Sequence, residues 1–145
     1  MNENFAKILE WSVWANLDEY KDIELLLLKG HLLLEIFINN LLSSKTVSEV
    51  ENLSFHMKIK YIDKLSKESG YGHNLVVALY DLNKLRNKLA HEWQFSIETS
   101  GIDSWANNVI TLMPSKKHGR YTYRTRIVHA YVSLAKELLE LEKKL

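Results

Sequence analysis

Apolar side chains recur every three or four residues along most of this chain, which is the spacing of amphipathic helices. The chain also contains a single proline, Pro114, and only five glycines, so it has few residues that break helices. We therefore expect an all-α protein of about five helices. At 145 residues the chain is long enough to bury one hydrophobic core, so residues 1–145 are expected to form a single domain.

The expected helices have different lengths and roles. The second is expected to form the spine of the bundle, because its apolar residues share one face, and Ser54 is expected to cap the third. Between the last two helices, residues 94–121 are expected to be irregular, with "SWANNVITLMP" forming a short strand or a loop. The five expected helices span about residues 4–14, 18–42, 55–68, 74–92 and 125–145.

Composition limits the cellular setting and the chemistry. The chain has no cysteine, which excludes disulfides, thiolate metal sites and thiol nucleophiles. Its start lacks the basic and then apolar order of a signal peptide. The most apolar run, residues 25–42, is interrupted by Lys29, His31, Glu35 and two asparagines, so no membrane span is expected. These features favour a cytoplasmic protein.

The positive charge is concentrated in one short segment. Residues 116–126, "KKHGRYTYRTR", carry five cations and no acid, whereas the rest of the chain has a net charge of −4. Cations interleaved with tyrosines supply the phosphate neutralisation and stacking faces that single-stranded nucleic acid binding needs. A solvated basic loop before the last helix accounts for the same pattern. The residues concerned are Lys116, Lys117, Arg120, Tyr121, Tyr123, Arg124 and Arg126.

The fourth helix contains one charge at an unusual position. Arg86 falls in the middle of the apolar stripe formed by Leu75, Leu79, Leu82, Leu89 and Trp93, and a buried charge costs several kcal/mol unless it is paired. A salt bridge to Glu24 or Glu35 of the second helix is one explanation. Asn87 and His91 lie on the opposite, polar side with Tyr80. For His91 alone, an interaction with the helix dipole is the simplest interpretation.

Taken together, these side chains suit phosphodiester chemistry. Arginine binds phosphate bidentately and keeps its charge, and histidine exchanges a proton near neutral pH. An explanation by metal binding is weaker, because the six histidines show no H-x(3)-H or HExxH spacing, and no metal or other cofactor is expected.

At these residues the sequence resembles the HEPN superfamily. "RNKLAH", Arg86 to His91, matches its R-x(4)-H pattern, in which a polar residue often follows the arginine. "LSFHMKIKYIDKLS" and "LVVALYDLNKLRNKLAHEW" resemble the two-helix block of a bacterial subgroup, so the similarity covers roughly residues 20–95. The resemblance implies an up-and-down helical bundle, often a homodimer whose motifs meet across the dimer cleft. Many members are metal-independent ribonucleases that act as toxins or defence effectors.

The resemblance also implies roles for individual residues. Arg86 would neutralise charge on the scissile phosphate, Asn87 would orient the phosphate or the histidine, and His91 would transfer the proton in attack by the ribose 2′-hydroxyl. Substrate RNA would also contact Tyr80, Asn83 and Trp93, together with the basic segment.

One departure and one alternative accompany the resemblance. Superfamily toxins silenced by nucleotidyltransferase partners commonly carry a tyrosine two residues after the histidine, where this chain has Trp93, so that mode of control is not expected. Other members, with mannitol operon repressor-like proteins as the nearest helical example, act as regulators, antitoxins, immunity proteins or scaffolds. A non-catalytic binding module with a protein partner therefore stays open beside the endoribonuclease.

Overall fold

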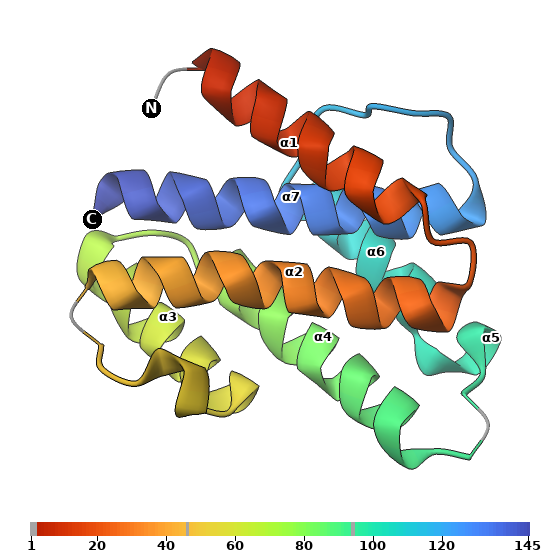
Figure 1. Ribbon diagram of the computed structural model, residues 1–145, viewed down its shortest axis with the longest axis horizontal. Coiled ribbons are helices and arrows are strands. Elements are labelled where there is room, and N and C mark those ends of the chain that lie inside the picture. The colour runs from red at the N-terminus through yellow and green to blue at the C-terminus, as the bar shows by residue number, and fades with distance from the viewer. Residues whose placement is uncertain (1–2, 46, 94) are drawn as a thin grey trace.

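The computed structural model describes residues 3–45, 47–93 and 95–145, with side chains from Lys7 onward. This part of the chain is all-helical and contains no strand, which confirms the expected class (Figure 1). Its elements are α1 (Glu3–Asp18), α2 (Ile23–Ser44), the 3-10 turn η1 (Val50–Asn52), α3 (Phe55–Ser69), α4 (Asn74–His91), α5 (Ile97–Ser100), α6 (Ile102–Leu112) and α7 (Tyr123–Lys144).

The helix count differs from the expected five, because α5 and α6 lie in the segment that was expected to be irregular. The strand or loop predicted for "SWANNVITLMP" was wrong. Trp105, Ala106 and Val109 are buried together with Ile102, and their spacing of three, one and three residues gives α6 one apolar face. Trp105 also ties α6 to α4, because its Nε1 donates a hydrogen bond to the Ala78 carbonyl at 3.0 Å. The stretch between α6 and α7 is irregular, as expected.

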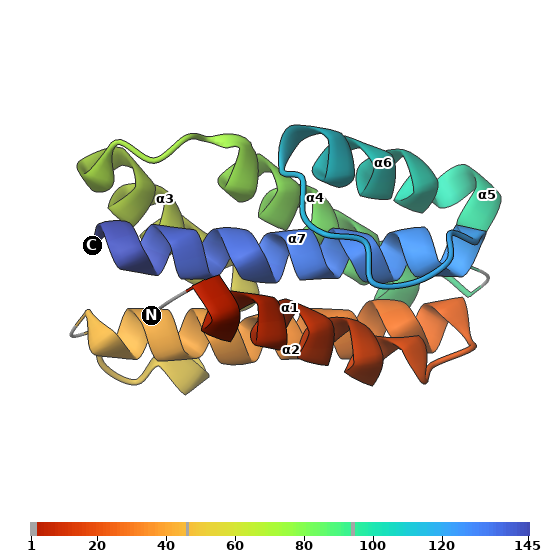
Figure 2. The ribbon, with the colours of Figure 1, turned by 90° about the horizontal axis from the view of Figure 1, so that it is seen from above.

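The centre of the bundle is α7 rather than α2. In Figure 2, α7 lies between α1 and α2 on one side and α3, α4 and α6 on the other. Its middle is buried on all sides, as expected for a helix with neighbours all round. Large apolar residues make up only part of this burial, and small side chains between them let neighbouring helices approach. Its buried residues include Ile127, Val128, Ala130, Tyr131, Val132, Ser133, Leu134, Ala135 and Leu138.

The contact between α2 and α7 depends on a glycine. A Cβ added at Gly30 would lie 2.3 Å from the ring of Tyr131, so only glycine fits at this crossing. The Tyr131 hydroxyl donates a hydrogen bond to the Leu27 carbonyl at 2.8 Å and so satisfies its polar atom within the core.

Side-chain caps fix the helix starts. Ser54 Oγ accepts a hydrogen bond from the Met57 backbone N–H at 3.2 Å, which confirms Ser54 as the cap of α3. Asp22 caps α2 in the same way through Leu25, so α2 begins at Ile23 and not near residue 18.

One helix in the described part of the chain, α2, is long and apolar enough to cross a membrane. Leu26, Leu27, Leu34 and Ile38 on one of its faces are nevertheless buried in the core. A core helix of a soluble protein has these same properties.

Candidate functional site

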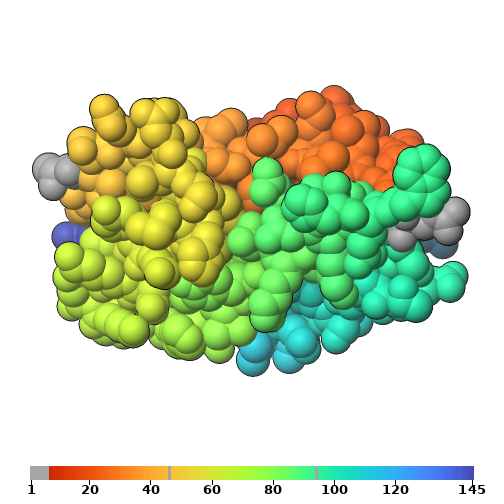
Figure 3. All heavy atoms as spheres, turned by 90° about the horizontal axis from the view of Figure 1, so that it is seen from below, coloured from red at the N-terminus to blue at the C-terminus, as the bar shows by residue number. Residues whose placement is uncertain are grey.

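The motif occupies the last two turns of α4. This helix forms because Leu75, Leu79 and Leu82 share a buried face, and Lys88 and His91 in its last turn complement the helix dipole. Figure 3 shows the surface of this part of the molecule, where α4 (green) runs between α2 (orange) and the α5–α6 region (teal).

Arg86 lies on the side of α4 that faces α2. Its side chain is half-buried, and it is one of the positive charges that act on the pKa of His31 in α2. Neither Glu24 nor Glu35 lies within 4.0 Å of its guanidinium, and the described residues offer it no other ion-pair partner. The expected salt bridge to the second helix is therefore not formed.

A different cation occupies the carboxylate of Glu35. Lys58 of α3 is 1% exposed, and its Nζ donates a hydrogen bond to Glu35 Oε2 at 2.7 Å. Burial makes this pair strong, because few waters screen it. Sequence reasoning missed Lys58 as part of the site. Its position between Met57 and Ile59 near the start of α3 gives no sign that it points inward.

His31 completes this buried polar cluster. Its Nδ1 lies 3.4 Å from Glu35 Oε1, and its ring packs against that of Phe55 at a tilt of 46°, with the ring centroids 4.0 Å apart. Burial lowers its pKa to about 4, the positive charges of Arg86 and Lys58 add to the effect, and Glu35 opposes it. His31 is therefore neutral at pH 7. Its Nε2 is buried and has no hydrogen-bond partner among the described residues.

The other motif residues lie at the surface. Asn87 and His91 are exposed, and no hydrogen bond joins His91 to Arg86 within the described chain. The two residues are five positions apart, which separates them by about 7.5 Å along the helix and by more than a third of a turn around it. One copy of the chain therefore does not bring the guanidinium and the imidazole together.

The three further residues predicted from α4 and its end differ in exposure. Asn83 and Tyr80 are half-buried, and Tyr80 packs against His56 of α3 with the ring centroids 5.5 Å apart. Trp93 is 97% exposed, so its predicted place in the apolar stripe was wrong. The helix ends at His91, and the helical periodicity that placed Trp93 on the buried face ends with it.

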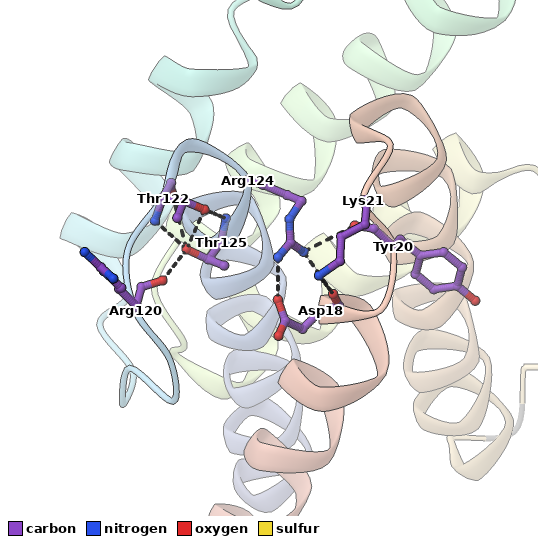
Figure 4. A network of polar contacts seen from close by, with 7 residues as sticks. All are labelled: Asp18, Tyr20, Lys21, Arg120, Thr122, Arg124 and Thr125. Carbon is purple, nitrogen blue, oxygen red and sulfur yellow. Dashed lines mark hydrogen bonds and ion pairs between the residues drawn. The ribbon is translucent and has the colours of Figure 1, made fainter.

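Arg124 in the basic segment, one of the predicted substrate contacts, has a structural role. Arg124 donates to the Asp18 carboxylate at 2.7 Å and to the Asp18 and Tyr20 carbonyls at 3.0 and 3.2 Å (Figure 4). It therefore ties the start of α7 to the end of α1. Beside it, Thr122 and Thr125 form a capping box, and Thr125 Oγ1 also donates to the Arg120 carbonyl at 2.7 Å.

A second set of contacts packs the basic segment against Trp14 of α1 and His129 of α7. The Tyr121 hydroxyl and His129 Nδ1 share a hydrogen bond of 2.5 Å, and His129 Nε2 lies 3.0 Å from the Ser115 carbonyl. Since the carbonyl only accepts, Nε2 carries the proton and Nδ1 accepts from Tyr121. Burial lowers the pKa of His129 and raises that of Tyr121. Lys117 Nζ lies 4.5 Å from the centroid of the Tyr121 ring.

These contacts keep the basic segment apart from the motif. In the described chain, the hydrogen bonds, ion pairs and ring contacts of residues 115–126 go to α1, the α1–α2 connection, α6 and α7, and none goes to α4. Figures 1 and 2 show the connection before α7 on the side of α7 away from α4. Lys116, Arg120 and Tyr123 remain exposed there, while Arg126 lies 4.0 Å from Asp103.

Comparisons of the chain with protein-family models, with curated proteins and with solved structures find no match.

Proposed function

We propose that this chain is a metal-independent endoribonuclease of the HEPN type that acts in the cytoplasm as a toxin or defence effector. The observation that carries the proposal is the state of Arg86, a half-buried guanidinium without an acid partner in the described part of the chain. Because Lys58 holds Glu35, Arg86 keeps its hydrogen-bond donors available for the oxygens of a phosphate.

The proposed reaction breaks one phosphodiester bond. The ribose 2′-oxygen attacks phosphorus, the bond from phosphorus to the 5′-oxygen breaks, and the product ends in a 2′,3′-cyclic phosphate. Arg86 stabilises the negative charge on the phosphate, Asn87 orients it, and His91 accepts the proton of the 2′-hydroxyl or donates one to the leaving oxygen. The exposed position of His91 leaves its imidazole accessible to RNA.

A homodimer is part of the proposal, because Arg86 and His91 of one copy do not meet. The side of α2 turned away from the core offers an apolar surface for association, and four large side chains on it are 39–57% exposed. Sedimentation should then give twice 17.0 kDa at micromolar concentration. The four exposed side chains on this surface of α2 are Leu25, Leu28, Leu32 and Ile36.

The test is cleavage of single-stranded RNA by the purified protein in EDTA. His91→Ala should lower the rate by about 10² to 10⁴-fold, as loss of a general acid or base does, with little change in melting temperature. His73→Ala is the matched control, since His73 is an exposed histidine at the opposite end of α4 and should keep full activity. If the wild-type protein leaves cellular RNA intact, the enzyme proposal fails.

The second candidate is a non-catalytic binding module that acts as a regulator, an antitoxin or an immunity protein. The observation that favours it is the separation of Arg86, His91 and the basic segment within one copy. A chain that stays monomeric, leaves RNA intact and unfolds more easily on Arg86→Ala would support this candidate, and its partner would then be a protein.

A further inference from the structure

A groove separates α4 from α6 on the side of α4 away from Arg86. Trp105 of α6 forms part of its floor and is fixed there by its hydrogen bond to the Ala78 carbonyl. Two adjoining hollows of about 90 and 290 Å³ make up the groove, and they share Asp81, Trp105 and Asn108. The groove is thus continuous, and α4 and α6 form its walls.

One end of the groove is apolar and exposed. Val77 of α4 is 45% exposed and Leu112 of α6 is 57% exposed, and Val109 and Met113 line the same hollow. A volume of about 90 Å³ is well below the 300–1,000 Å³ of typical small-molecule sites, so this end suits a single aliphatic side chain.

The other end is basic. Lys84 and Lys88 of α4 line the larger hollow, opposite Ser100 and Ser104. Lys84 lies 4.0 Å from Asp81, whereas Lys88 has no ion-pair partner among the residues that the structure describes. An occupant with negative charge at this end therefore gains the attraction of a cation that the fold itself does not use.

The spacing of the two ends sets the shape of the occupant. Val77 precedes Lys84 by seven residues and Lys88 by eleven, which places the basic end about 10 to 16 Å along the helix from the apolar end. A helical ligand that lies along the groove spans this distance in two to three turns.

We propose that the α4–α6 groove binds an amphipathic helical segment of a partner protein, which places an aliphatic side chain in the apolar end and acidic side chains against Lys84 and Lys88. This function goes beyond the proposed ribonuclease, because Arg86 does not line the groove. RNA fits the groove poorly, since single-stranded bases stack on exposed aromatic rings. Among the described residues that line the groove, Trp105 alone is aromatic, and it is 6% exposed.

The probe is a pair of fluorescein-labelled helical peptides on an Ala–Gln background. One has Leu with Glu seven and eleven residues after it, the other has the reverse order, and binding is followed by fluorescence anisotropy with unlabelled protein. One of the two should bind saturably, and its version with Lys in place of Glu should not. Leu112→Glu and Lys88→Glu should each weaken binding roughly tenfold or more, as changes at central interface residues do.

Matched controls keep the test specific. Ile8→Glu introduces the same charge at an aliphatic side chain of α1 that is 66% exposed, against 57% for Leu112, and Lys60→Glu reverses an exposed lysine on α3. Both should bind the peptide as the wild type does, and circular dichroism should show that all four variants are folded. The indole N–H resonance of Trp105 should shift when the peptide binds.

Three results would overturn the proposal. They are no saturable binding of either peptide, equal losses in the groove and control variants, or binding of oligouridine that depends on Lys88 but not on Leu112. None of them depends on whether the chain cleaves RNA, so the two proposals fail separately.

Discussion

Lys58 Nζ lies 2.7 Å from Glu35 Oε2 in a cluster where Arg86 is the other cation near α2. The buried lysine binds this carboxylate because water cannot solvate its charge there. Arg86 is half-buried and keeps access to water, so it remains unpaired at lower cost. The pair between α2 and α3 thus determines the state of a residue on α4.

The first prediction concerns the asymmetry of this pair. Glu35→Gln leaves the charge of Lys58 buried without a partner and should cost about 3–5 kcal/mol in the free energy of unfolding. Lys58→Met should cost less, because Glu35 is partly exposed and can pair with Arg86. Urea denaturation measures both.

The double variant provides the control for this prediction. Glu35→Gln with Lys58→Met removes both charges and should recover most of the stability lost in Glu35→Gln alone. Additive losses would show that the two side chains do not interact in solution.

The sequence predicted the helices well and the site less well, for a physical reason. Apolar periodicity and caps such as Ser54 are local signals, so the all-helical class and most helix ends follow from the chain itself. The partner of Glu35 depends on how α2, α3 and α4 meet, and no periodicity encodes that choice. The sequence pointed to Arg86 as the partner of Glu35, whereas packing places the buried Lys58 there.

The basic segment shows the same limit. Its composition predicts a surface for nucleic acid, but Arg124 is half-buried on Asp18, which lies more than a hundred residues earlier. Long-range contacts of this kind leave no mark in local charge patterning. The error at α6 has a different cause, because its apolar residues recur with a local helical spacing that the prediction of a strand or a loop overlooked.

The second prediction tests the crossing of α2 and α7. Gly30→Ala places a methyl group 2.3 Å from the Tyr131 ring, so the helices must separate or the ring must move. We expect a loss of about 1–3 kcal/mol or more, as overpacked cores show. Gly72→Ala is the matched control, because nothing lies within 4 Å of the added atom, and thermal melting should show it to be close to wild type.

The third prediction separates architecture from RNA binding in the basic segment. Arg124→Gln removes a charged hydrogen bond and two bonds to carbonyls, and we expect it to cost about 1.5–3 kcal/mol. Arg120→Gln, at an exposed side chain, should leave the melting temperature within a degree or two of wild type.

RNA affinity should show the opposite pattern. Arg120→Gln should weaken binding of single-stranded RNA and reduce its salt dependence, whereas folded Arg124→Gln should bind as the wild type does. Equal affinity of wild type and Arg120→Gln at low salt would count against a role of this segment in holding RNA.

The last prediction is a loss of stability in mild acid that arises from buried histidines. Burial holds the pKa of His31 near 4, below the 6.5 of an unfolded histidine, so the unfolded chain takes up a proton first as the pH falls. The stability due to this difference is complete above pH 6.5 and decreases between pH 6.5 and 4, by about 3 kcal/mol at pH 4 for His31 alone. His129, whose pKa burial also lowers, acts in the same direction.

Urea midpoints at half-unit steps from pH 8 to pH 4 measure this slope. His31→Gln removes the titrating ring, so its stability should vary less between pH 6.5 and 4 than that of the wild type, even where its stability at pH 7 is lower. His73→Gln changes an exposed histidine and should keep the wild-type slope. If His31→Gln and the wild type lose stability in parallel as the pH falls, His31 takes up its proton in the folded chain as readily as in the unfolded chain, and its burial beside Lys58 and Arg86 is wrong.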